Sequence, residues 1–301
     1  MIDILLATYN SERYLREQID SIREQSVTDW RLLVRDAAST DTTVEIVRAY
    51  EREDPRIRLV EIGAAKSCEN FARLLDKSDA DYVMFADHDD VWFKDKIAKS
   101  MERLRALEAQ FGRDAPLLVF TDAVVTDSAL KTLSPSLLKW AGNDSCRVLP
   151  RQLALQNVAN GNTMLFNAAL RRRCGKIPSG ALMHDYWMML VASSFGHIGF
   201  VESPTLLYRQ HGTNVLGASS FGAGYLIDRV RKGAEVARRR LRESIDQVSL
   251  FADQYGDASP AVFKALRGIG NLPWMGRRRL LLEYRIAKCG LIRNLIAYAL
   301  I

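Results

Sequence analysis

Three carboxylates within four positions directly follow an apolar run at residues 82–86; they are Asp87, Asp89 and Asp90. Crowded carboxylates repel one another, so they cost stability unless a cation compensates them. Hard divalent cations such as Mg²⁺ take oxygen ligands, usually one or two carboxylates together with substrate phosphates. The spacing therefore predicts a divalent-metal site that holds a diphosphate. The alternative is a solvated acidic turn in which Asp90 or a neighbour caps the next helix.

Small and polar residues follow the first apolar run of the chain, residues 2–7. They are Thr8, Tyr9 and Asn10. Residues at the carboxyl end of a strand in a parallel sheet line the crevice where ligands bind, so these side chains are candidates for a nucleotide pocket. The alternative is a turn and helix start, with Asn10 or Ser11 as the N-cap.

Another polar stretch, from Arg35 to Asp41, follows the apolar run 30–34. Asp36 is placed to accept hydrogen bonds from a ribose or a base. Thr40 or Asp41 is equally suited to cap the helix that follows. The two interpretations are compatible because they concern different residues.

Asp185 opens an apolar stretch, residues 184–194, that is typical of a helix. A helix N-terminus stabilises the anionic form of a carboxylate. A general base must be ionised and within hydrogen-bond reach of the proton that it takes. Asp185 is therefore a candidate base, and an N-cap without a chemical role is the alternative.

The stretch Tyr208 to Asn214, followed by Gly217, combines a cation, a histidine and flexible glycine backbone. Arg209 and His211 could contact a diphosphate if this stretch covers it. A lone histidine is more often structural than a ligand, so a structural role for His211 is the alternative.

The elements that must position these residues alternate in type over the first 120 residues. Apolar periodicity predicts strands at 2–7, 30–34, 57–62, 82–86 and 117–120, and helices at 12–25, 41–50, 71–75 and 94–111. This βαβα alternation predicts an α/β fold with a mostly parallel central sheet and helices on both faces.

The remaining residues differ in character. Residues 121–215 mix short strands (163–166, 198–201) with a helix (184–194), and the tail is helix-like at 225–251 and 277–301. We expect a catalytic domain at 1–220, with a nucleotide-binding half (1–120) and an acceptor half (121–220). Residues 221–301 are then a helical C-terminal extension.

The net charge of +6 is concentrated in the tail, where residues 222–301 carry 15 Lys/Arg against 7 Asp/Glu. Basic amphipathic helices can lie on anionic membrane surfaces, so we expect peripheral membrane contact. The alternative is that these basic faces pack on the catalytic domain or on a second subunit of an oligomer. No nucleic-acid-binding module accompanies the charge.

The apolar segments, the N-terminus and the cysteines indicate the cellular compartment. No segment reaches the roughly 20 consecutive apolar residues of a membrane span, and the N-terminus lacks the features of a signal peptide. The four cysteines are far apart and form no CxxC pair, which argues against structural zinc and against a disulfide framework. We therefore expect a cytoplasmic protein, peripheral on the inner face of the membrane.

Together these motifs resemble the family 2 glycosyltransferases, which have the GT-A fold, and most closely their rhamnosyltransferase-like branch of bacterial surface-polysaccharide enzymes. The resemblance rests on Ala-Thr-Tyr-Asn-x-x-x-Tyr-Leu-x-x-Gln-Ile-x-Ser-Ile at 7–22 and on Asp-x-Asp-Asp-Val-Trp at 87–92. His-Asp-x-Trp at 184–187 and Tyr-Arg-Gln-His-x-x-Asn at 208–214 complete it.

The resemblance implies a metal-dependent, inverting transfer of rhamnose or a similar sugar from a dTDP- or UDP-sugar to a saccharide or lipid-linked acceptor. It implies Asp185 as the catalytic base and Mg²⁺ or Mn²⁺ as the cofactor. It implies metal ligation by Asp89, Asp87 and His211. The implied donor-binding residues are Thr8, Tyr9, Asn10, Asp36, Asp87, His88, Arg209 and His211.

Two departures from the family pattern leave an alternative open. The family has Asp-Asp-Gly-Ser after the second strand, where this chain has Asp36, Ala37, Ala38 and Ser39. The second Asp is commonly a base contact, so its absence keeps a catalytically degenerate sugar-nucleotide-binding protein as the alternative. His184 stands where the family usually has Glu, a change that the rhamnosyltransferase-like branch tolerates.

Overall fold

A computed structural model describes residues 1–211 and 223–301 of the chain. The described residues divide into two compact units. The first comprises 1–137, 159–179 and 183–211, and the second comprises 138–158, 180–182 and 223–301. The second unit therefore takes in residues 138–158 as well as the tail. The predicted motif residues Asn214 and Gly217 lie outside the described residues.

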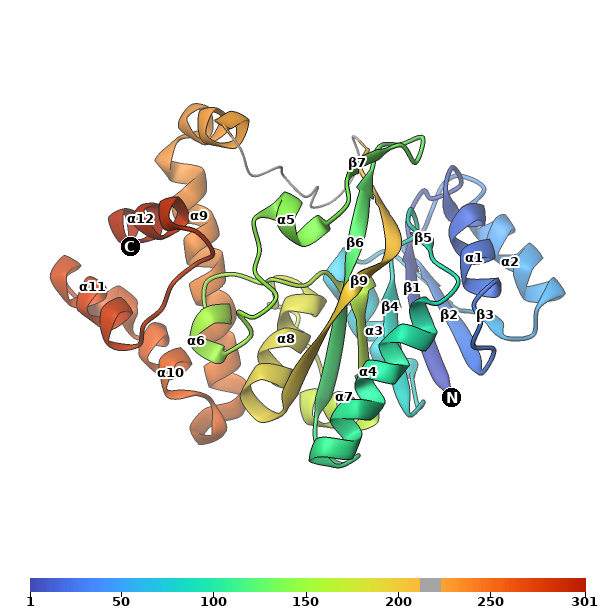
Figure 1. Cartoon of the computed structure of the whole chain (residues 1–301), viewed down its shortest axis with the longest axis horizontal. Helices are drawn as coiled ribbons and strands as arrows, with labels where there is room; N and C mark the ends of the chain where they lie inside the picture. Colours follow the sequence, from blue (N-terminus) through green and yellow to red (C-terminus); the bar gives the residue numbers. More distant parts are fainter. Residues whose placement is uncertain (212–222) are drawn as a thin grey trace. The chain divides into compact units, whose positions relative to one another are not determined.

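The first unit contains a mixed sheet with the strand order β3-β2-β1-β4-β8-β6-β9-β5, and β7 pairs with β6 (Figure 1). Its strands are β1 Ile2–Thr8, β2 Trp30–Asp36, β3 Ile57–Ile62, β4 Tyr82–Ala86, β5 Val91–Trp92, β6 Leu117–Thr126, β7 Thr132–Ser134, β8 Met164–Asn167 and β9 His197–Arg209.

Strands β3, β2, β1 and β4 run parallel, as the βαβα alternation predicts. Thr8 is in register with Asp36, and Leu6 is in register with Ala86. The side chains of β1, β2 and β4 are mostly buried, which is typical of a sheet covered on both faces, whereas those of the edge strand β3 are more exposed. The polar residues that follow the strands therefore meet at one edge of the sheet.

Beyond β4 the sheet departs from simple alternation. Strand β8 lies antiparallel between β4 and β6, whereas β6 and β9 run parallel over most of their length. The predicted strands at 117–120 and 198–201 are the first parts of longer strands. The two-residue strand β5, which pairs with β9, was not predicted because so short a segment shows no periodicity.

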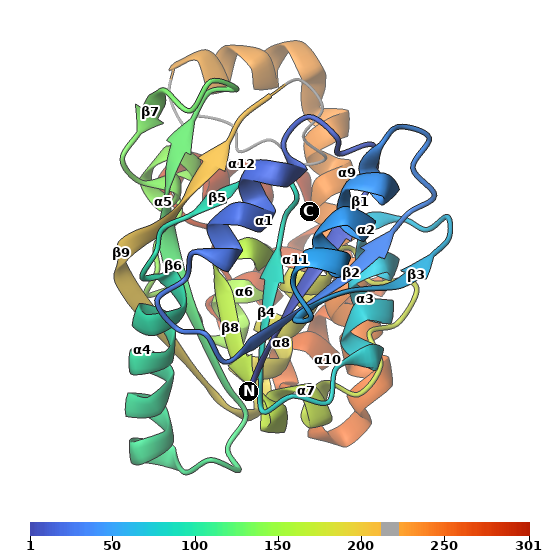
Figure 2. The same ribbon diagram turned by 90° about the vertical axis from the view of Figure 1, so that its right-hand side faces the viewer.

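Helices cover both faces of the sheet, as predicted. On one face of the sheet α1 packs on α2, and the Ser26 N–H, just after α1, donates to the Lys94 carbonyl, just before α4. On the other face α8 packs against α3 and α7 (Figure 2). The helices of the first unit are α1 Leu15–Arg23, α2 Thr43–Glu53, α3 Ser67–Lys77, α4 Lys96–Phe111, α7 Ala168–Cys174 and α8 His184–Phe195.

The turns before α1 and α2 explain where these helices begin. Helix α1 starts three residues later than predicted, because Asn10 and Ser11 bond across to residues just before and at the start of α2. The Asn10 Oδ1 accepts from the Thr40 N–H at 2.9 Å, and the Ser11 N–H donates to Thr43 Oγ1 at 2.7 Å. Asp41 accepts from the Thr43 N–H at 3.0 Å and so bonds the first turn of α2.

The second unit is helical. Its described helices include α6 Pro150–Leu153, α9 Ala223–Tyr255, α10 Ala261–Arg267, α11 Trp274–Glu283 and α12 Leu291–Leu300, and α5 Leu137–Ala141 begins at its boundary. Helix α9 kinks at Gly233, where φ is 73°. The predicted helix 277–301 is instead α11 and α12, separated by Arg285 at φ 51° and Gly290 at φ 85°. A left-handed residue of this kind commonly ends a helix.

Within the described ranges, no helix combines the length and apolarity that crossing a bilayer requires.

The turn after β2 carries backbone strain at Ala38, whose φ is 63°. A left-handed conformation costs a residue with a Cβ atom about 1–2 kcal/mol. We expect Ala38→Gly to raise the free energy of unfolding by about 1 kcal/mol in urea denaturation. The matched control is Ala37→Gly, since Ala37 is buried and outside the left-handed region. The control should lose about 1 kcal/mol, and an equal loss in both variants would contradict the assignment of strain.

Candidate functional site

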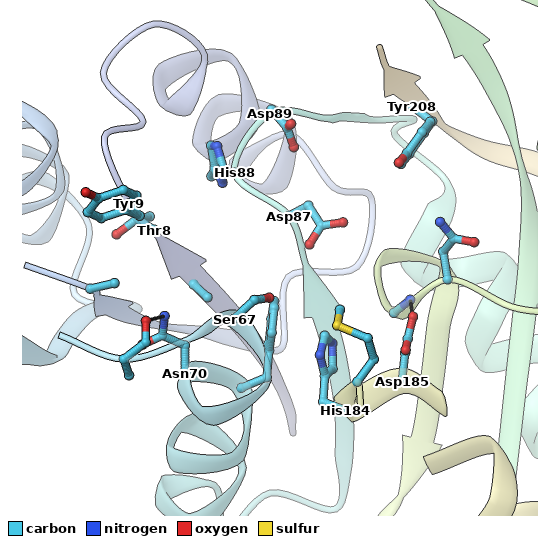
Figure 3. Close-up of a pocket in the computed structure, with 17 residues that line it drawn as sticks. Thr8, Tyr9, Ser67, Asn70, Asp87, His88, Asp89, His184, Asp185 and Tyr208 are labelled. Carbon is cyan, nitrogen blue, oxygen red and sulfur yellow. Dashed lines mark hydrogen bonds between the residues drawn. The ribbon is translucent and has the colours of Figure 1, made fainter. Parts of the chain in front are cut away.

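A cavity of about 250 Å³ opens at the edge of the sheet where β1, β2 and β4 end (Figure 3). All of its lining residues belong to the first unit. They are Ala7, Thr8, Tyr9, Ala37, Ala65, Ser67, Asn70, Phe71, Asp87, His88, Asp89, Asn160, Gly161, Met183, His184, Asp185 and Tyr208. The site therefore gathers residues from segments nearly 200 positions apart in the chain, and several motifs of the sequence meet in it.

The ends of β1 and β2 form one wall. Thr8 lines the cavity, and its hydroxyl donates to Asp36 Oδ2 at 2.8 Å. Asp36 is fully buried, and its carboxylate also accepts from the backbone N–H and the hydroxyl of Ser39, at 2.7 and 2.6 Å. Asp36 thus holds the turn together beneath the cavity, whereas Ala37 is the residue of this turn that lines it.

The predicted pair Tyr9 and Asn10 separates. Tyr9 lines the cavity with a side chain that is 57% exposed, as expected of a residue at a rim. Asn10 does not line it, because its side chain bonds the backbone before α2.

Asp87 and Asp89 face the cavity from the end of β4, on either side of His88 (Figure 3). Burial, and then the negative charges of Asp89 and Asp185, raise the pKa of Asp87 to about 8. Asp89 lies 2.7 Å from His211 Nε2. Burial lowers the pKa of His88, so this histidine adds little positive charge to balance the carboxylates.

This donor set suits a hard cation. Among residues 1–211 and 223–301, no three His, Cys, Asp or Glu groups converge closely enough to hold an ion by themselves. Mg²⁺ commonly takes only one or two protein carboxylates and completes its shell with water and substrate phosphates. The carboxylates of Asp87 and Asp89, with the imidazole of His211 beside Asp89, fit a cation that arrives with a phosphorylated ligand.

Asp90 turns away from the cavity into the core. It is fully buried, accepts from the side-chain amide of Asn162, and accepts from the Arg209 N–H at 3.3 Å. Burial, reinforced by the charges of Asp89 and Asp87, raises the pKa of Asp90 well above its usual range. Burial lowers the pKa of Lys96 to about 7, against the charge of Asp90. No sequence motif pointed to Asn162 or Lys96, and neither residue directly follows a predicted strand.

Arg209 belongs to the same support and does not line the cavity. Its buried guanidinium donates to the backbone carbonyls of Asp89 at 2.8 Å and Ser128 at 2.7 Å, pairs with Glu17, and lies 4.3 Å from the ring centroid of Tyr14. These contacts fix the backbone at Asp89, so the observed geometry gives Arg209 a positioning role.

Asp185 lies in the first turn of α8 and faces the cavity beside Gly161 (Figure 3). Its carboxylate accepts from the Gly161 N–H at 3.1 Å and from its neighbour Tyr186 N–H at 2.5 Å. Burial raises the pKa of Asp185 to about 6, although these two N–H groups oppose the shift. A carboxyl with such a pKa can accept a proton near neutral pH.

The sequence missed Asn160 and Gly161 on one side of the cavity, and Ser67 and Asn70 on another. Ser67 and Asn70 could have been predicted from the sequence, because Ser67 begins the helix that follows the third parallel strand. Asn160 and Gly161 could not, because they precede an antiparallel strand.

Comparison with known proteins assigns the N-terminal part of the chain to a family. Residues 3–116 match the model of glycosyl transferase family 2. These residues form a family 2 glycosyltransferase domain, so the chain is an enzyme that transfers sugars, as the sequence motifs predicted.

Two relatives of this glycosyltransferase come from bacteria. The dTDP-rhamnosyl transferase RfbG of Shigella flexneri is 28% identical over 234 residues, which cover 73% of this chain and 76% of that protein. The putative teichuronic acid biosynthesis glycosyltransferase TuaG of Bacillus subtilis is 31% identical over 130 residues, which cover 42% of this chain and 51% of that protein.

Solved structures confirm the GT-A fold. Staphylococcus aureus TarS 1–349 in complex with UDP-GlcNAc has a TM-score of 0.58 at 15% identity, covering 99% of this chain and 89% of that one. The mannosyltransferase PcManGT of Pyrobaculum calidifontis, in complex with GDP-Man and Mn²⁺, has a TM-score of 0.51 at 16% identity, covering 99% and 84%.

Proposed function

We propose that this glycosyltransferase moves rhamnose or a similar sugar from a dTDP- or UDP-sugar to a hydroxyl of a glycan or lipid-linked acceptor, in the synthesis of a cell-surface polysaccharide. One observation carries the proposal: a single cavity has Asp87 and Asp89 on one side and Asp185, with a raised pKa, on another. The likeness to RfbG supports a dTDP-rhamnose donor. The proposed domains are a donor half (1–120), an acceptor half (121–220) and an extension (221–301).

We propose an inverting single displacement. Asp185 takes the proton from the acceptor hydroxyl as its oxygen bonds to the anomeric carbon. The bond from that carbon to the diphosphate breaks, and the nucleoside diphosphate leaves with the electron pair. The chain's contribution is to hold the two reactants in line and to keep Asp185 oriented through the Gly161 N–H.

Asp89, with Asp87 and His211, would hold Mg²⁺ or Mn²⁺. A bound cation would neutralise charge on the departing diphosphate. In this proposal Thr8, Tyr9 and His88 contact the donor directly. Asn10, Asp36 and Arg209, predicted as donor-binding residues, instead shape the walls, since their side chains bond within the protein.

Turnover of dTDP-rhamnose and UDP-sugars, followed as release of nucleoside diphosphate with Mn²⁺ or Mg²⁺, tests the proposal. We expect Asp89→Ala to abolish release, and Asp185→Asn to lower kcat by about 10²–10⁴-fold while nucleotide binding persists. Asp95→Asn is the matched control, because Asp95 is a half-exposed carboxylate that precedes α4, pairs with Lys99 and does not line the cavity. Donor binding without any turnover, even with acceptor glycans, would favour the alternative, a degenerate binding protein.

The raised pKa of Asp185 predicts a pH dependence. Only the ionised carboxylate accepts a proton, so kcat/KM should fall as the pH drops through about 6, approaching tenfold per pH unit below it. The profile should be measured between about pH 5 and 8, with Asp95→Asn as the control. An acid limb near the ordinary aspartate value would contradict Asp185 as the buried base.

For the extension we propose contact with an anionic membrane surface. Large apolar side chains are exposed on and beside its last two helices: Trp274, Met275, Leu282, Leu291, Ile292 and Leu295. Not every arginine there is available to lipid, because Arg277 and Arg278 donate to backbone carbonyls. Arg279 and Arg285 are exposed beside Leu282. Apolar side chains flanked by cations match a surface of anionic headgroups over acyl chains.

Vesicle sedimentation tests this contact on the intact chain. We expect binding to phosphatidylcholine vesicles that contain phosphatidylglycerol, weaker binding without it, and at least about tenfold weaker binding of a Leu291→Asp, Leu295→Asp double variant. The control is Leu133→Asp, an exposed leucine of the first unit. Absence of vesicle binding together with a dimer in sedimentation would assign the face to a second copy.

A further inference from the structure

We infer that His184 binds a hydroxyl of the transferred sugar and so contributes to the choice of donor. The inference rests on the proposed function and goes beyond it, because the motifs gave His184 no role. His184 lines the cavity, yet its side chain is only 3% exposed. Neither ring nitrogen has a hydrogen-bond partner within the part of the chain that the structure describes.

An unpartnered buried polar group destabilises the protein, and a ligand that completes its hydrogen bonds removes this cost. Burial lowers the pKa of His184 to about 3, so the ring is neutral at physiological pH. A neutral imidazole has one donor nitrogen and one acceptor nitrogen. A hydroxyl, which donates and accepts, matches that pair better than a phosphate oxygen, which only accepts.

The ring is held in place by packing alone. It stacks on Phe71 at 3.8 Å between centroids and meets the edge of Phe85 at 4.6 Å. Phe71 belongs to α3 and Phe85 to β4, so His184 packs against the half of the sheet whose strands end at Thr8, Asp36 and Ala86. In Figure 3 His184 lies between Ser67 on α3 and Asp185. This placement favours the donor sugar over the acceptor.

Gly161 connects His184 to the base. A Cβ atom at Gly161 would lie 2.7 Å from His184 Nε2, which is too close for any ordinary contact. The missing side chain therefore leaves room for the ring, while the Gly161 N–H donates to Asp185. The Nε2 edge of His184 is thus adjacent to the segment that orients Asp185, the proposed base.

Titration calorimetry with two pairs of ligands tests the inference: dTDP-rhamnose against dTDP, and UDP-GlcNAc against UDP. The variants are His184→Phe, which keeps the stacking but removes both nitrogens, and His184→Gln, which restores a donor and an acceptor. We expect His184→Phe to bind the preferred sugar nucleotide about tenfold more weakly, with nucleoside diphosphate affinity unchanged. His184→Gln should recover part of the loss.

His197→Phe is the matched control, because His197 is an exposed histidine that stacks on Phe111 away from the cavity. The sugar-dependent difference should be flat between about pH 6 and 8, since a neutral ring does not titrate there. Unchanged binding in His184→Phe, or equal loss for nucleotide and sugar nucleotide, would overturn the inference. So would a raised acceptor KM with intact donor binding, which would place His184 on the acceptor.

The proposed function can fail separately. If wild-type protein binds neither sugar nucleotide more tightly than its nucleoside diphosphate and shows no turnover, the function is wrong and the inference falls with it. Turnover of either donor with unaltered binding by His184→Phe overturns the inference alone.

Discussion

The constraint on which the site depends is the desolvation of like charges. Four carboxylates, Asp87, Asp89, Asp90 and Asp185, end up in or beside one cavity. Each raises the free energy of its neighbours' ionised forms. Together with burial, which is the larger cause, this repulsion raises the pKa values of Asp87 and Asp90. A protein can keep such a set only if each carboxylate has compensation, either within the chain or from a ligand.

The four carboxylates differ in the groups that stabilise them. This difference distinguishes the carboxylate that supports the fold from those available for the reaction. Asp90 is hydrogen-bonded inside the core by the Asn162 amide and the Arg209 N–H, beside the Lys96 amine, whose pKa burial lowers to about 7. Asp185 has two backbone N–H groups and an intermediate pKa. Asp87 and Asp89 face the cavity, where a cation bound together with a diphosphate can supply the positive charge that the chain does not provide. The arrangement therefore commits Asp90 to structure and leaves the other three for chemistry.

Sequence reasoning reached the part of this arrangement that follows a local rule. Thr8, Tyr9 and Asp87 were found because polar residues that end neighbouring parallel strands share one edge of a sheet. All four parallel strands of this half of the sheet, β1 to β4, were predicted. The same rule, applied after β3, would also have found Ser67 at the start of α3. It failed for Asn160, Gly161 and Lys96, because antiparallel strand β8 and the core behind β4 bring them in from distant segments that have no period or motif of their own. Asp36, Asn10 and Arg209 were predicted to bind the donor because of their positions in the chain. They do lie near the cavity, but their side chains bond within the protein, which only the structure shows.

The two alanines after Asp36 differ in role: Ala38 shapes the backbone of the turn, and Ala37 lines the cavity. Ala38 occupies a left-handed position where the family pattern has glycine, and the turn keeps that conformation because Asp36 bonds both the N–H and the hydroxyl of Ser39. Ala37 presents a methyl group to the cavity at the place where the family pattern has a carboxylate. In the proposed function, recognition of the donor base therefore relies on other polar lining groups, among them Tyr9, Ser67 and Asn160. Asn70 is less available for that role, because Arg35 donates to its side chain and it donates to the Ala65 carbonyl.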